Sequence, residues 1–176
     1  MQYAGKNNLL YLYRVKNHLT YLLIGGNEGN REEWLAKATV AIADSCGSIR
    51  RSSACYETAA WGKEDQRSFL NQVLELETPL SPAALLQQTT EIENLLGRQR
   101  TEKWGARTLD IDLLFYDDVV MDEPDLKIPH PFLQERRFTL VPLQELVPDL
   151  VHPVLQVSIQ TLLDQCTDLQ EVQLYL

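Results

Sequence analysis

Apolar positions in the first part of the chain change from a short β-type run to a helical spacing. The apolar run over 18–24 ends at two glycines and predicts a buried strand that enters a tight turn. Beyond Asn30, apolar side chains recur at helical spacing as far as Gly47, and Asn30 with Glu33 forms a helix-start signal. The pattern predicts an amphipathic helix that ends before Gly47.

Two more strands and a second helix follow. The segments 48–56 and 69–77 are strand-like, and the second alternates apolar with polar positions. Ser81 and Pro82 form a capped helix start, and one apolar face then continues as far as Gly97. The first half of the chain therefore predicts the order β-α-β-β-α.

The second half supplies one long strand and shorter elements. An aperiodic loop over 98–108 leads into a β-type run over 109–116. The remaining features are a short segment over 119–121, a rigid turn at Pro129-His130-Pro131 and two short helices over 137–146 and 157–166. The order β-α-β-β-α-β with additional helices and long loops for catalytic residues predicts an α+β ferredoxin-like sandwich, with helices on an antiparallel-rich sheet.

Length and composition restrict the class of protein. The 176 residues are enough for one hydrophobic core, so we predict a single domain over 19–176 after a tail over 1–18, with 9–13 as a candidate edge strand. The net charge of −9 argues against a nucleic-acid partner, and the short apolar runs argue against a membrane. Three widely spaced cysteines favour a reducing cytoplasm. We expect a monomer.

Two carboxylates in the last strand are candidate metal ligands. Asp110 and Asp112 are two residues apart, so both project from one face of the strand while Ile111 points to the other. Paired carboxylates suit Mg²⁺, which prefers oxygen ligands and binds substrate phosphates. On the pattern alone, a merely solvated strand face is an equally good interpretation.

The loop before this strand is cationic. It carries Arg98, Arg100, Lys103 and Arg107 within a chain of negative net charge. Arginine side chains next to a metal-binding carboxylate pair are what a bound polyphosphate requires, so nucleotide phosphate is the natural ligand. The alternative is a solvated charged loop, although Trp104 favours a lid or a stacking surface.

Other candidates are weaker when taken singly. The glycines at 25–29 match neither a P-loop nor a G-x-G-x-x-G fingerprint. His130 between two prolines is well placed to donate to phosphate, and Asn71 beside Phe69 could bind the edge of a flat heterocycle. Structural roles for His130 and Asn71 are the alternatives.

Read together, these residues resemble one known family. The stretch K-W-G-A-R-T-L-D-I-D-L-L over 103–114 carries the resemblance, and its R-T-L-D-I-D-L-L segment is highly specific. Further matches are Gly25-x-Asn27, Tyr56-x-Thr58, Phe69-Leu70-Asn71, Glu93, Arg98-x-Arg100, Pro129-His130-Pro131 and Glu135-Arg136-Arg137-Phe138. Over 19–165 the sequence resembles 6-hydroxymethyl-7,8-dihydropterin pyrophosphokinase, an enzyme family of folate biosynthesis.

The resemblance implies transfer of pyrophosphate from ATP to the hydroxymethyl group of the pterin, which leaves AMP. It implies two Mg²⁺ ions on Asp110 and Asp112, with Arg98 and Arg107 also catalytic. The implied ATP contacts are Glu93, Arg98, Arg100, Lys103, Trp104, Arg107, Ile111, His130 and Arg136. The implied pterin contacts are Thr58, Ala59, Ala60, Trp61, Phe69, Asn71 and Phe138. The alternative function is a non-catalytic ferredoxin-like regulatory module that binds nucleotide or pterin.

Overall fold

The computed structural model describes residues 16–59, 67–98 and 106–176. The candidate edge strand over 9–13 lies outside these residues, so the division into a tail and one domain stays a prediction. Within the described ranges, none of the helices has the length and apolar character needed to cross a membrane.

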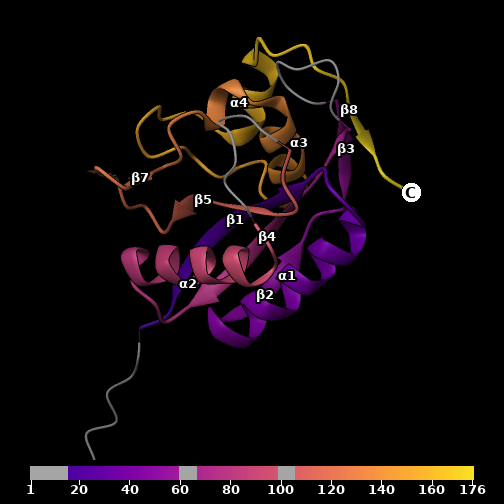
Figure 1. The fold of residues 1–176 in the computed structure, drawn as a ribbon. Coiled ribbons are helices and arrows are strands. Elements are labelled where there is room, and N and C mark those ends of the chain that lie inside the picture. The colour runs from indigo at the N-terminus through magenta and orange to yellow at the C-terminus, as the bar shows by residue number, and fades with distance from the viewer. Residues whose placement is uncertain (1–15, 60–66, 99–105) are drawn as a thin grey trace, which may run out of the picture.

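A mixed-length antiparallel sheet forms the centre of the fold (Figure 1). Strand β1 (His18–Gly26) lies between β4 (Phe69–Thr78) and β5 (Asp110–Tyr116) and is antiparallel to both. On its other edge β4 pairs with β2 (Ser48–Ser52) and β3 (Tyr56–Thr58), and β3 pairs with β8 (Val172–Leu174). Strand β1 is therefore a central strand of the sheet, with long pairings on both of its edges.

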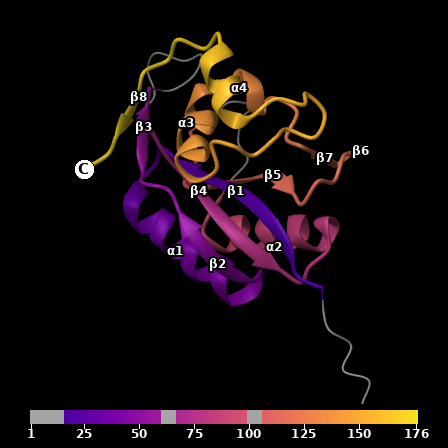
Figure 2. The ribbon, with the colours of Figure 1, turned by 180° about the vertical axis from the view of Figure 1, so that it is seen from behind.

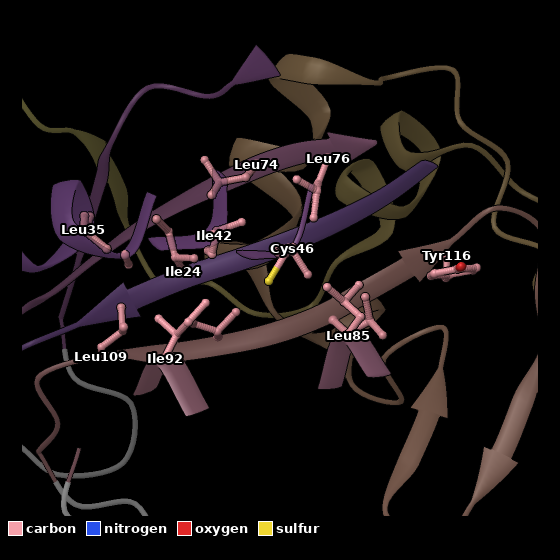
Figure 3. Close-up of a cluster of buried hydrophobic side chains, with 14 of the residues drawn as sticks. Ile24, Leu35, Ile42, Cys46, Leu74, Leu76, Leu85, Ile92, Leu109 and Tyr116 are labelled. Carbon is pink, nitrogen blue, oxygen red and sulfur yellow. The ribbon is translucent and has the colours of Figure 1, made fainter. Parts of the chain in front are cut away.

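Helices cover both faces of this sheet (Figures 1 and 2). On one face lie α1 (Arg31–Ser45) and α2 (Pro82–Leu95), and the buried side chains between them and the sheet are shown in Figure 3. On the other face, α3 (Arg137–Leu146) and α4 (Ile159–Gln165) enclose a second apolar cluster. The smaller elements are the hairpin of β6 (Met121–Glu123) with β7 (Leu126–Ile128) and a 3₁₀ turn at Leu133–Glu135.

The predicted helix starts and the fold class are confirmed. The side chains of Asn30 and Ser81 accept hydrogen bonds from backbone N–H groups in the first turns of α1 and α2. Gly47 follows α1 with φ +150°, and a Cβ there would lie 2.2 Å from the Glu77 carbonyl oxygen. With β2 and β3 counted as one interrupted strand, the element order is the predicted β-α-β-β-α-β.

The prediction of one continuous strand over 48–56 is wrong. The chain forms two strands along β4 because it departs from regular pairing around Ser53. The Ser53 N–H donates to the Val73 carbonyl at 2.9 Å, while the Ser53 hydroxyl accepts from the Val73 N–H at 2.9 Å. The Ser53 hydroxyl thus takes the place of a backbone carbonyl as acceptor for the Val73 N–H. This side-chain hydrogen bond interrupts the backbone pairing with β4.

The sequence pattern also did not predict the C-terminal strand β8. Asp168, just before it, anchors this part of the chain to α3: its Oδ2 accepts from the Arg137 N–H at 3.1 Å, and its Oδ1 accepts from the Gln170 N–H at 3.0 Å. The side chain of Arg136, the N-cap residue of α3, forms no capping hydrogen bond. A carboxylate from a distant segment therefore supplies the missing cap and complements the helix dipole.

We predict that Asp168→Ala lowers the free energy of unfolding by about 1 kcal/mol, the usual effect of losing a helix cap. Urea unfolding followed by circular dichroism measures this change. Asp149→Ala is the matched control, because Asp149 is exposed. Equal unfolding midpoints for the two variants would contradict a capping role for Asp168.

Candidate active site

Three strands bring the candidate site residues into one row across the sheet. In the register of β1, Gly25 lies opposite Asn71 of β4 on one side and opposite Asp110 of β5 on the other. Directly opposed residues project to the same face. Two positions earlier in β1, Leu23 packs in the cluster beneath α3 and α4, so the row lies on that face.

A side chain at position 25 would clash with Asn71 on the neighbouring strand. A Cβ on Gly25 would lie 2.2 Å from Asn71 Oδ1, well inside contact distance. Asn71 is buried, and its Nδ2 donates to Thr58 Oγ1 on β3 at 3.3 Å. The glycine therefore allows the amide of Asn71 to lie across β1 with its orientation fixed by Thr58.

The aspartate pair projects as its spacing predicts. Asp110 and Asp112 line the same cavity, while Ile111 packs in the cluster beneath α1 and α2. Two guanidinium groups compensate the charge of Asp110: Arg98 Nη2 lies 2.8 Å from Oδ1, and Arg107 forms an ion pair with Oδ2. In this structure the arginines occupy the position beside the carboxylate where a cation would bind.

Glu93 belongs to α2, on the other face of the sheet, and contacts both Arg98 and strand β5. The carboxylate is buried, forms an ion pair with Arg98 and accepts from the Ile111 N–H at 2.7 Å. Burial raises the pKa of the Glu93 carboxyl in spite of the attraction of the Arg98 guanidinium. Glu93 thus holds Arg98 against the first residues of β5.

Asp112 is in a less favourable electrostatic environment than Asp110. Desolvation, followed by the charge of Asp110, raises the pKa of the Asp112 carboxyl to about 7. Its cationic neighbour, Arg136, is 3.8 Å away, measured from Nη1 to Oδ2, and compensates the charge only in part. An undercompensated carboxylate next to a second carboxylate is suited to bind a cation.

His130 is neutral at physiological pH. Burial, with the nearby Arg136 charge, lowers the pKa of its imidazole to about 4. The Phe132 N–H donates to His130 Nδ1 at 3.3 Å, which assigns the ring proton to Nε2. A neutral imidazole whose Nε2 is a donor retains the ability to bind an anionic oxygen.

One cavity of about 360 Å³ contains most of the predicted site residues. From the predicted nucleotide side it is lined by Glu93, Arg98, Arg107, Asp110, Ile111, Asp112, His130 and Arg136. From the predicted pterin side it is lined by Thr58, Ala59, Phe69, Asn71 and Phe138. The predicted residues Ala60, Trp61, Arg100, Lys103 and Trp104 lie outside the described residues.

Asn27 joins the chain segments that enter β4 and β5. Its Nδ2 donates to the Arg67 carbonyl at 3.1 Å, and its Oδ1 accepts from the Arg107 N–H at 2.9 Å. The Asn27 N–H donates to the Arg107 carbonyl at 2.9 Å. One buried side chain at the end of β1 therefore positions residues next to both halves of the cavity.

The cavity also includes residues that our reading of the sequence did not assign to a site. These are Leu23, Gly25, Leu86, Thr90 and Gln170. Gly25 belongs to the Gly25-x-Asn27 motif of the family, so this motif could have indicated its place in the site. Gln170 belongs to a C-terminal segment without periodicity or motif, so nothing in the sequence pattern indicated it.

The donor set suits a divalent cation that arrives with its own oxygen ligands. In the described ranges, no group of three or more His, Cys, Asp or Glu side chains forms a candidate metal site. The two aspartates supply only part of a coordination sphere. Mg²⁺ commonly takes one or two protein carboxylates and completes its sphere with water and phosphate oxygens, so the residues present fit a Mg²⁺–phosphate ligand.

Comparison with known proteins identifies the family. The profile of 7,8-dihydro-6-hydroxymethylpterin-pyrophosphokinase (HPPK) matches residues 21–148. This chain belongs to the HPPK family. A 2-amino-4-hydroxy-6-hydroxymethyldihydropteridine pyrophosphokinase of Aquifex aeolicus is 42% identical over 134 residues, which are 76% of this chain and 83% of that protein. The Bacillus subtilis protein of the same name is 40% identical over 131 residues, 74% and 78% of the two chains.

Solved structures support the HPPK fold. A crystal structure of Plasmodium falciparum HPPK-DHPS superposes with a TM-score of 0.71 at 18% sequence identity and covers 90% of this chain. The present chain corresponds to 46% of that longer chain. At this identity the similarity concerns the fold, and it confirms the ferredoxin-like architecture of the HPPK family member described here.

We predict that Asp112→Asn stabilises the metal-free protein at pH 8. The pKa of Asp112 is raised above its unfolded value, so the folded state binds more protons than the unfolded state between about pH 4 and pH 7. Ionisation of Asp112 therefore lowers stability as pH rises through this window. Asparagine removes that cost, and Tm in EDTA at pH 8 should rise by about 2–4 °C.

The same measurement at pH 4 should show little difference between wild type and Asp112→Asn, because both side chains are then neutral. Asp118→Asn is an exposed control that leaves Tm unchanged at both pH values. A lower Tm for Asp112→Asn at pH 8 in EDTA would contradict the electrostatic cost assigned to Asp112.

Proposed function

We propose that this chain transfers pyrophosphate from ATP to 6-hydroxymethyl-7,8-dihydropterin, giving the pterin diphosphate and AMP in folate biosynthesis. The observation that carries this function is the shared cavity, which is lined by an aspartate pair and arginines and also by a buried asparagine and two phenylalanines. Membership of the HPPK family supports the same reaction.

The cationic wall of the cavity is assigned to the phosphates of ATP. Arg98 and Arg107 are held at Asp110, and Arg136 lies beside Asp112. Their guanidinium groups form charge-assisted hydrogen bonds to phosphate when the nucleotide enters, and His130 donates from Nε2. Glu93 and Ile111 complete the nucleotide side, and we assign Arg100, Lys103 and Trp104 to the same role.

Asp110 and Asp112 would hold two Mg²⁺ ions together with the phosphates. Bound Mg²⁺ would neutralise phosphate charge and lower the pKa of the attacking hydroxyl. Arg98 and Arg107 neutralise Asp110 in the ligand-free chain, and both guanidinium groups would be available to the phosphates once Asp110 holds a cation. We assign no side chain as a dedicated base.

The opposite end of the cavity is assigned to the pterin. Asn71, oriented by Thr58, offers amide groups to the hydrogen-bonding edge of the ring, while Phe69 and Phe138 supply aromatic surface. Ala59 lines the same end, and we assign Ala60 and Trp61 to it as well. This pocket orients the hydroxymethyl group towards the phosphates.

Chemically, the reaction is a displacement at phosphorus. The hydroxymethyl oxygen attacks the β-phosphorus of ATP in line and forms a new O–P bond, while the hydroxyl proton is released to water. The bond from the β-phosphorus to the oxygen shared with the α-phosphate breaks, and AMP leaves with that oxygen. Arg98, Arg107 and Arg136 stabilise the phosphate charge. The two walls of the cavity fix the reacting atoms relative to each other, so the protein contributes mainly positioning and electrostatics.

Release of AMP tests the function directly. The protein is incubated with ATP and Mg²⁺, with and without 6-hydroxymethyl-7,8-dihydropterin, and the pterin product is analysed by mass spectrometry. AMP release that depends on the pterin, with a diphosphorylated pterin as product, establishes the reaction. Binding of ATP without any AMP release would instead indicate the non-catalytic regulatory module. We further propose that the protein is cytoplasmic and monomeric.

We predict that Asp110→Asn and Asp112→Asn each lower kcat by at least about 10²-fold, because each removes one oxyanionic ligand for the cation that accompanies the phosphates. Quantification of AMP at saturating substrates measures the loss. Asp122→Asn, on the distant β6–β7 hairpin, is the control. Undiminished turnover in Asp112→Asn would refute the metal assignment.

We predict that Gly25→Ala raises KM for the pterin by about tenfold with little change in ATP affinity, because the new methyl group displaces the Asn71 amide. Steady-state kinetics with each substrate varied in turn separate the two effects. Asn71→Ala and the double variant complete a mutant cycle. Strictly additive losses would show that Gly25 does not act through Asn71.

A further inference from the structure

The pterin end of the cavity has a wall that comes from outside the family-matched region. Gln170 lines the cavity beside Thr58 and Ala59, and it follows the matched residues 21–148 by more than twenty positions. Its Nε2 donates to the carbonyl oxygen of Ala59. The C-terminal segment thus contacts the backbone at the point where β3 ends and the pterin wall begins.

Two anchors hold the backbone of this segment. Strand β8 pairs with β3, with Val172 opposite Thr58. On the other side, Asp168 accepts from the Gln170 N–H and from the Arg137 N–H at the start of α3, next to Phe138. Residues 168–174 therefore connect β3 with the first turn of α3, and both of these elements contribute lining residues, Thr58 and Phe138, to the cavity.

The nitrogen and the oxygen of the Gln170 side-chain amide differ in their hydrogen bonding. Its nitrogen has the Ala59 carbonyl as partner, whereas its Oε1 is buried and has no hydrogen-bond partner in the part of the chain that the structure describes. A buried acceptor without a partner lowers stability. The side chain is therefore poorly explained as a stabilising contact, and its donor end is the part that acts on a neighbour.

We propose that Gln170 is a positioning residue of the pterin subsite, which fixes the Ala59 carbonyl and, through the end of β3, the Thr58 side chain that orients Asn71. The inference rests on the proposed pterin substrate. Within the described ranges, the hydrogen-bond partners of Gln170 are the Ala59 carbonyl and the Asp168 carboxylate, and neither residue is assigned to the phosphates. Pterin affinity therefore depends on this C-terminal residue, whereas ATP affinity does not.

Three variants separate the functions of the amide. Gln170→Met removes donor and acceptor at similar length, Gln170→Lys keeps a donor, and Gln170→Glu keeps only acceptors. Dissociation constants for 6-hydroxymethyl-7,8-dihydropterin and for α,β-methylene-ATP with Mg²⁺ are measured by calorimetry. We expect pterin binding about five- to tenfold weaker in the Met and Glu variants, close to wild type in the Lys variant, and unchanged ATP-analogue binding throughout.

The kinetic and stability results should follow the same division. In the Met variant the pterin KM rises while kcat at saturation stays close to wild type, and Tm does not fall because the unpartnered acceptor is gone. Gln173→Met on β8 is the matched control, since Gln173 is exposed, and it should leave both affinities unchanged.

Several results overturn the inference. Wild-type pterin affinity in Gln170→Met excludes a positioning role. Wild-type affinity in Gln170→Glu with loss in Gln170→Lys shows that Oε1, and not the contact with Ala59, matters. A fall in Tm with weaker binding of both ligands shows a general structural role. If the wild-type protein itself does not bind the pterin, the proposed function fails rather than the role of Gln170.

Discussion

The pairing of β1 with β4 on one side and β5 on the other is the constraint on which the site depends. It places Asn71, Gly25 and Asp110 in one row, although they are far apart in the sequence. The residues that we assign to the two substrates thus lie on one sheet. A register shift of one residue in either pairing would turn the asparagine or the aspartates to the opposite face. Apolar clusters on both faces hold this register.

The charged side chains of the cavity are better suited to exchange their ion pairs for a bound ligand than to stabilise the fold. Asp110 forms ion pairs with two arginines, Asp112 has the Arg136 guanidinium at 3.8 Å, and buried Glu93 pairs with Arg98. Buried ion pairs of this kind contribute little net stability, because desolvation offsets their attraction. Their value lies in keeping cations and carboxylates ready for a ligand that brings both charges. The polyphosphate and metal ion that we propose as ligand would satisfy each partner when the protein pairs separate.

Local signals in the sequence predicted most of the fold and the projection of Asp110 and Asp112 from one face of β5 into the cavity. The caps at Asn30 and Ser81 and the alternation of Asp110 with Ile111 act within a few residues, so periodicity and capping chemistry predict them. The break at Ser53 depends on a hydroxyl that bonds to another strand, and strand β8 depends on an edge that only the folded sheet provides. Gln170 and Asp168 act across long sequence separations, which no local pattern encodes.

Asn27 shows why the two ends of the cavity are coupled. Its amide bonds to the backbone of Arg67 and of Arg107, the residues that lead into β4 and β5. Beside it, Gly26 lies so close to Thr108 that a Cβ would be 2.2 Å from the Thr108 carbonyl oxygen. The end of β1 is thus in direct contact with the backbone of both entering segments. A displacement of either segment must alter these shared contacts, so the geometries of the proposed phosphate side and the proposed pterin side are physically linked through one asparagine.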